Sequence, residues 1–216
     1  MHTPHKPPKP TYRGVLHSYA FFAAIPAVVY LMAYSNSGPL FWSMLIYSIS
    51  LLGLLGTSAL YHRIRWSPKA ERAMGTLDRT MIYAFIAGSI TPFAVLAMTG
   101  ILPIVLLSVF WGAVLMGAIV NLFWLNAPRW IHSMLYLAVS WAGIVAVPQL
   151  WDNLGFTALA WIFAGGILYS IGGIVYALQR PDPLPKVFGF HEVFHVFVTL
   201  AVAIHYGVIS QYLIPI

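Results

Sequence analysis

Residues 39–62 read PLFWSMLIYSISLLGLLGTSALYH, a run of 24 residues without Asp, Glu, Lys or Arg. A helix needs about 20 apolar residues to cross the hydrocarbon core of a bilayer, so this stretch predicts a transmembrane helix. Other stretches of the chain have the same character. The expected spans are residues 15–35, 39–62, 78–98, 101–123, 130–149, 155–178 and 190–213. The sequence therefore predicts an all-α polytopic membrane protein, a bundle of seven transmembrane helices.

The composition supports the membrane assignment and excludes other classes. The 216 residues are 60% hydrophobic and 7% charged, whereas soluble domains carry about 25% charged residues. A water-soluble enzyme and a disordered chain are therefore excluded. The net charge of +6 comes from basic residues scattered in short loops, so no nucleic-acid surface is expected. Because there is no cysteine, disulfides and thiolate metal sites are excluded as well.

The basic residues predict the orientation. The boundary between 78–98 and 101–123 is the weakest, and merging these stretches would give six spans. Lys and Arg concentrate in cytoplasmic loops, and seven spans with a cytoplasmic N-terminus put all 11 of them on that side. Six spans would put the basic residues on both sides, because Arg129, Arg180 and Lys186 would move to the side opposite the others. We expect a multi-pass protein of the plasma (inner) membrane with an extracytoplasmic C-terminus. Residues 1–13 are expected to be a disordered, basic, Pro-rich tail and residues 14–216 a single seven-helix domain.

Ionisable side chains within spans are costly and therefore mark functional sites. His62 ends the second span, Asp78 begins the third, and His191 and His195 lie in the first turns of the seventh, all on the expected cytoplasmic side. His191 and His195 are four residues apart and share one helical face. With His62 they predict a three-histidine Zn²⁺ site that leaves one position for water. Asp78 is expected to take a proton from that water or to orient it, and Ser58 to hydrogen-bond water or substrate.

The remaining candidates are weaker. His132 and His205 are interpreted as interfacial or hydrogen-bonded residues, and His17 as a lesser candidate for a bond around the site. Residues 191–195 also read H-E-x-x-H, the signature of zinc proteases. Such a protease needs a third ligand downstream, and there His205 is the sole histidine, ten residues along the same helix, with no Asp or Glu. The protease interpretation is therefore disfavoured, and the role of Glu192 stays open.

These residues carry a resemblance to a known family. The motifs are Ser58-Ala-Leu-Tyr-His62, Asp78 with Thr91-Pro92-Phe93, and residues 180–195. In combination they resemble the hemolysin III family, within the progestin and adipoQ receptor (PAQR) family and the wider superfamily that includes alkaline ceramidases. The resemblance implies a seven-helix bundle with its N-terminus in the cytoplasm, zinc held by the three motif histidines, and Asp78 reaching the metal through water. It further implies lipid-amide hydrolysis for eukaryotic relatives, and haemolytic activity and membrane-lipid homeostasis for bacterial ones.

Three functions follow as hypotheses. The first is a zinc-dependent, ceramidase-like hydrolase of an amide or ester in a membrane lipid, with Asp78 as general base and Ser58 holding the oxyanion. The second is a non-enzymatic sensor or regulator of the membrane in which zinc is structural. The third is cytolysis. The first two require the same ligands, so the sequence does not separate them.

Overall fold

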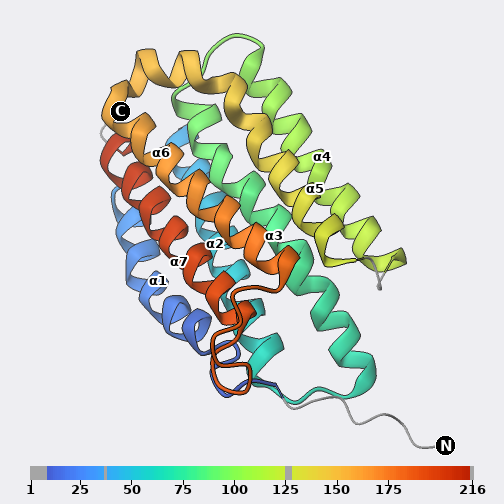
Figure 1. Ribbon diagram of the computed structural model, residues 1–216. Helices are drawn as coiled ribbons and strands as arrows, with labels where there is room; N and C mark the ends of the chain where they lie inside the picture. Colours follow the sequence, from blue (N-terminus) through green and yellow to red (C-terminus); the bar gives the residue numbers. More distant parts are fainter. Residues whose placement is uncertain (1–8, 37, 125–127, 215–216) are drawn as a thin grey trace, which may run out of the picture.

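The structure is a computed structural model, and it describes residues 9–36, 38–124 and 128–214. The described part of the chain is helical and contains no strand. Figure 1 shows its helices lying side by side as a bundle. They are α1 Val15–Ala33, α2 Gly38–Arg63, α3 Pro68–Leu96, α4 Leu102–Phe123, α5 Arg129–Trp141, the 3₁₀ segment η1 Ala142–Ala146, α6 Val147–Leu178, α7 Phe190–Val208 and the π-helical segment η2 Ile209–Leu213.

Six helices of the described residues are long and apolar enough to cross a membrane. The fifth is the 50-residue stretch Arg129–Leu178, which contains α5, η1 and α6. This stretch folds back on itself: Trp141 Nε1 donates to Ser170 Oγ at 3.0 Å, and Figure 1 shows α5 beside α6. Gly155, with φ 78° and ψ 176°, interrupts α6 next to the break expected between residues 149 and 155. The count of seven crossings and the orientation stay predictions.

The start of α3 differs from the prediction. This helix begins at Pro68, ten residues before the expected start at residue 78. The Ser67 side chain accepts from Ala70 N and Pro68 occupies the first turn, a favourable start for a helix. The prediction followed apolar residues alone, whereas the first turns of α3 carry Lys69 and Arg72. Its 29 residues span about 43 Å, longer than the roughly 30 Å hydrocarbon core.

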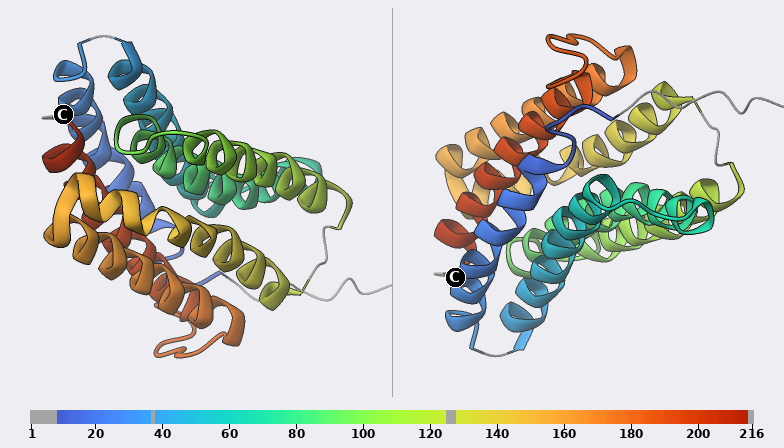
Figure 2. Two further views of the ribbon diagram at one scale, coloured as in Figure 1. Left: turned by 90° about the horizontal axis from the view of Figure 1, so that it is seen from above. Right: turned by 90° about the horizontal axis from the view of Figure 1, so that it is seen from below.

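The helices form two layers, which Figure 2 shows from above and from below. Helices α2, α3 and α4 make one layer, α5, α6 and α7 the other, and α1 packs against α2 and α7. Small residues permit the close contacts, as is common between membrane helices. A Cβ at Gly88 of α3 would lie 2.0 Å from Ser50 Oγ of α2. Buried apolar residues of both layers, among them Leu54, Phe85 and Leu159, belong to one core cluster.

One end of the bundle gathers segments that are distant in sequence. Thr11 N donates to Lys186 O at 3.1 Å and Tyr12 N to Val187 O at 3.0 Å. Arg63 Nη1 at the end of α2 donates to Thr11 O at 3.4 Å. Figure 1 shows this end below, where the segment before α1 meets the α6–α7 loop. Of the predicted tail, residues 1–8 lie outside the described residues, whereas residues 11–13 contact the rest of the bundle.

Candidate metal centre

Three histidines from two helices meet at this end of the bundle. His62 lies in the last turn of α2, and His191 and His195 lie in the first two turns of α7. One ring nitrogen from each falls within 4.8 Å of the other two, and the Nε2 atoms of His62 and His191 are 3.1 Å apart. His62 and His195 are buried. The three residues predicted from the sequence as ligands therefore lie close enough to bind one metal ion.

The geometry of the cluster fits zinc. Two ligands of a tetrahedral zinc with bonds of about 2.0–2.1 Å lie about 3.3–3.4 Å apart. The nitrogens of His62 and His191 are 3.1 Å apart, which is close to this separation. All three ligand nitrogens lie within 4.8 Å of one another, so no pair is more than about 1.5 Å farther apart than two zinc ligands. Imidazole donors suit zinc, and also copper, iron and nickel. The residues fit a metal of this class, with three protein ligands.

The two predicted catalytic residues border the cluster. Asp78 Oδ2 of α3 lies 3.9 Å from His62 Nε2. Ser58 of α2 is buried, and its Oγ lies 2.8 Å from Nδ1 of His17 in a hydrogen bond. Ser58 and Asp78 also line the same cavity. A carboxylate from α3 therefore lies beside one metal ligand, and a hydroxyl from α2 bonds the histidine that stacks on another.

His17 has a larger part in the cluster than its sequence position suggested. Its ring stacks on that of His195, with centroids 3.7 Å apart and planes inclined by 8°. The hydrogen bond to Ser58 fixes the same ring from the other helix. His17 thus supports both a ligand and the serine, in agreement with the expected bond around the site. The stacking could not be foreseen, because nothing in the sequence places α1 against α7.

Glu192, whose role the sequence left open, contacts Gly189 and Arg13. Its Oε2 accepts from Gly189 N at 2.7 Å, which caps the start of α7. Its Oε1 lies 2.6 Å from Arg13 Nε, and the carboxylate is 3% exposed. Both carboxylate oxygens of Glu192 therefore have partners, which does not match the glutamate that acts as general base in an H-E-x-x-H protease.

The other two histidines lie outside the cluster, as expected. His205 Nε2 lies 3.1 Å from Ile162 O, a hydrogen bond between α7 and α6. His132 of α5 is buried beside Tyr136, with ring centroids 6.2 Å apart. Neither belongs to the group of described residues that could share a metal ion.

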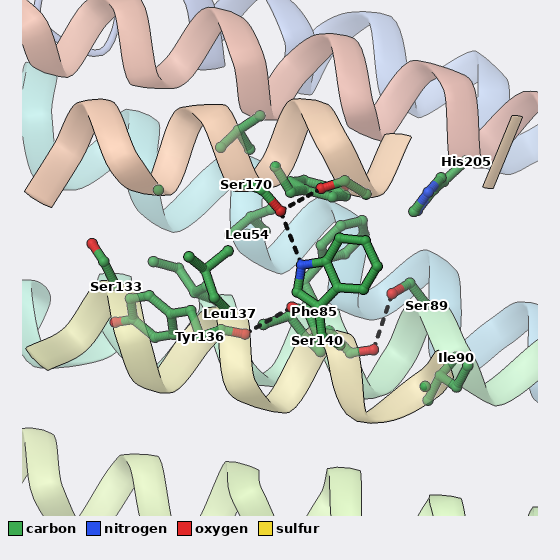
Figure 3. Close-up of a pocket in the computed structure, with 18 of the residues that line it drawn as sticks. Leu54, Phe85, Ser89, Ile90, Ser133, Tyr136, Leu137, Ser140, Ser170 and His205 are labelled. Carbon is green, nitrogen blue, oxygen red and sulfur yellow. Dashed lines mark hydrogen bonds between the residues drawn. The ribbon is translucent and has the colours of Figure 1, made fainter. Parts of the chain in front are cut away.

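An apolar cavity of about 230 Å³ runs between the two layers and reaches the cluster. One water needs only about 10–15 Å³ of such space, so the cavity is large enough for a ligand. At one end lie His17, Ser58, Asp78, His191 and His195, and at the other Phe93, Phe110, Leu159 and His205. Figure 3 shows Ser133 and His205 at opposite sides of this space, with Leu54, Phe85 and Leu137 between them.

Sequence reasoning missed two residues of the cavity wall. Arg79 lines the cavity beside Asp78, although as a charged residue in a predicted span it was used only to set the orientation. Tyr176 of α6 lines it as well, with its ring centroid 5.6 Å from that of His191. This contact depends on the packing of α6 against α7. A single tyrosine in the sequence does not indicate it.

Comparison with known proteins places the chain in a family. Residues 5–206 match the model of the family described as haemolysin-III related. Hemolysin-3 of Bacillus cereus is 29% identical over 205 residues, covering 94% of this chain and 90% of the relative. The hemolysin-3 homolog of Bacillus subtilis (strain 168) is 30% identical over 188 residues, covering 86% and 85%. Human monocyte to macrophage differentiation factor is 26% identical over 214 residues, covering 95% and 87%. The chain belongs to the haemolysin-III-related family of multi-pass membrane proteins.

Proposed function

We propose that this protein is a zinc-dependent hydrolase that cleaves an amide or ester bond in a membrane lipid. The observation that carries the proposal is the apolar cavity, because it ends at the same histidines, aspartate and serine that could perform the chemistry. A site that only bound a metal ion would not need this cavity. A site for a polar substrate would not open onto an apolar cavity.

The dimensions of the cavity agree with a lipid chain. His191 and His205 lie at its two ends and are 14 residues apart on α7, which corresponds to about 21 Å along a helix. The hydrocarbon of one leaflet is about 15 Å deep, half of the bilayer core. The rise between these two lining residues is thus of the order of one leaflet, which supports an acyl chain along the cavity with the bond that follows it near His191.

The residues around the cluster divide the chemical work. His62, His191 and His195 would hold the zinc, which when bound lowers the pKa of water and polarises a carbonyl. Asp78 is close enough to accept the proton of the attacking water and to return it to the leaving group. Ser58 is placed by His17 to donate a hydrogen bond to the substrate oxygen on which charge develops. The apolar walls exclude bulk water and strengthen these interactions.

We also propose seven crossings, with the N-terminus in the cytoplasm of the cell and the protein in the plasma membrane. The fold-back between α5 and α6 supports the extra crossing. The basic residues of the N-terminal segment, the end of α2 and the α6–α7 loop gather at one end of the bundle, which supports the orientation. The zinc site would then lie near the inner headgroups.

A structural role for zinc is the second candidate function. The cluster joins α2 to α7, and His17 adds α1, so a metal there would also clamp three helices. In that case the protein would be a sensor or regulator of the membrane. The hydrolase needs Asp78 for its activity even when zinc is bound, whereas a protein with a structural zinc does not.

The test of the main proposal is His191→Ala in the purified full-length protein. Loss of a ligand should lower the zinc content and abolish hydrolysis of lipid amides or esters together, because the open site needs three ligands. His132→Ala removes a buried histidine outside the cluster and should change neither zinc content nor hydrolysis. Hydrolysis at the wild-type rate in a zinc-free His191→Ala protein would reject the proposal.

A further inference from the structure

The start of α1 touches both helices that carry the metal ligands. Gly14, just before α1, has φ 78°, and a Cβ there would lie 2.5 Å from His62 Cβ of α2. One turn later His17 stacks on His195 of α7 and bonds Ser58 of α2. A single turn of α1 therefore packs against two of the three ligands.

An ion pair fastens this turn to α7. Arg13 Nε lies 2.6 Å from Glu192 Oε1, with the two side chains 17% and 3% exposed. Glu192 stands between His191 and His195 in sequence, so the pair acts on the turns that carry both ligands. The backbone bonds of Thr11 and Tyr12 to the α6–α7 loop extend the same connection.

We propose that Arg13 and Glu192 are positioning residues that hold the first turns of α7 against α1 and thereby slow the release of the metal. Outer partners that orient the ligands are general determinants of metal affinity. A buried ion pair that loses one member leaves an uncompensated charge, which disturbs the packing around it. The inference rests on the proposed metal site and adds to it a residue pair that touches neither metal nor substrate.

The same contacts argue against Glu192 as the base that the H-E-x-x-H pattern would predict. Its Oε2 is engaged by Gly189 N and its Oε1 by Arg13. Neither oxygen is free to take a proton from water at the cluster. Among the described residues, Asp78 has His62 and no arginine within ion-pair distance.

The test measures how fast zinc leaves the protein. Purified full-length wild type, Arg13→Gln, Glu192→Gln and the double variant are loaded with zinc in detergent and mixed with a chromogenic chelator. Each single variant should release zinc about tenfold faster, because the charge that remains, on buried Glu192 or half-buried Arg13, loses its partner. The double variant should be no faster than the faster single variant, because the pair acts as a unit. Glu192→Gln keeps an oxygen that can accept from Gly189 N, so the cap of α7 is retained.

The controls are Lys69→Gln and Asp152→Asn, which neutralise exposed charges on α3 and α6 and should leave the release rate unchanged. Unchanged release from both single variants would overturn the inference, and so would rates that multiply in the double variant. Thermal unfolding of the zinc-free variants is measured in parallel. A fall in stability with unaltered release would mean a merely structural pair and would also overturn it. Wild-type protein that holds no zinc would instead reject the metal site itself, a failure seen in its metal content before any variant is compared.

Discussion

Asp78 is the residue that distinguishes a catalytic zinc from a structural zinc. It approaches His62 to 3.9 Å but comes from a different helix, and it is not one of the three grouped ligands. Its removal should therefore affect the reaction more than the binding of the metal.

We predict that Asp78→Asn retains zinc and loses about 10²–10⁴-fold in turnover, the usual contribution of a general base. Zinc content and the rate of lipid hydrolysis are measured on the same preparation. Asp152→Asn, an exposed substitution at the far end of the bundle, should keep full activity. Full turnover in Asp78→Asn would reject Asp78 as the general base, whereas zinc-loaded wild type without any lipid hydrolysis would favour the structural role of zinc.

The residue scale is also where the sequence was most informative about the site. His62, Ser58, Asp78, His191 and His195 were all foreseen as neighbours, because charged and imidazole groups are rare in spans and topology gave them a common depth. Contacts that depend on which helices are adjacent could not be foreseen. The stack of His17 on His195 and the pair of Arg13 with Glu192 are of this kind.

The close packing of α2 on α3 rests on glycine. At Gly88 a methyl group would lie 2.0 Å from Ser50 Oγ and 2.6 Å from Ser50 Cβ. The serine side chain is short and its hydroxyl donates to Tyr47 O at 2.8 Å, so it has little freedom to move aside. The helices themselves would have to separate.

Gly88→Ala should therefore destabilise the protein by about 1–3 kcal/mol, the usual cost of overpacking. Gly112 of α4 offers a matched control, since nothing lies within 4 Å of a Cβ there. Gly112→Ala should be neutral or stabilise by about 0.4–1 kcal/mol, because the unfolded chain loses freedom. Thermal unfolding in one detergent compares the two, and equal stability of both variants would contradict the close approach of α2 and α3.

At this scale the sequence predicted the helices well and their ends less well. Four of the expected spans match α1, α2, α4 and α7 with its extension η2 within about two residues. The polar first turns of α3 were missed, since an apolar pattern does not register a helix that continues into water. The prediction left residues 150–154 as a connection between two spans. In the structure the chain is helical on both sides of a kink at Gly155.

For the whole molecule the number of crossings decides on which sides the two ends lie. Seven crossings place the termini on opposite sides of the membrane, and six place them on the same side. The doubling-back of Arg129–Leu178 favours seven.

We predict that alkaline phosphatase, which is active only outside the cytoplasm, is active when fused after Ile216. The same reporter fused within the loop between α2 and α3, which carries Arg65, should be inactive, because basic loops remain inside. Reporter activity in intact cells is the measurement. An inactive C-terminal fusion that is made in normal amounts would contradict the seven-crossing arrangement.

The backbone bonds of Thr11 and Tyr12 to the α6–α7 loop have a practical consequence for anyone who purifies this protein. An affinity handle attached ahead of Met1 would be joined to the chain only ten residues before Thr11, and tension on it would be transmitted to the helix turns beside the imidazoles. A handle attached after Ile216 avoids that strain, since η2 ends at Leu213, on the side of the bundle away from the imidazoles. Preparations made with the two handles should differ in how well they retain metal during washing.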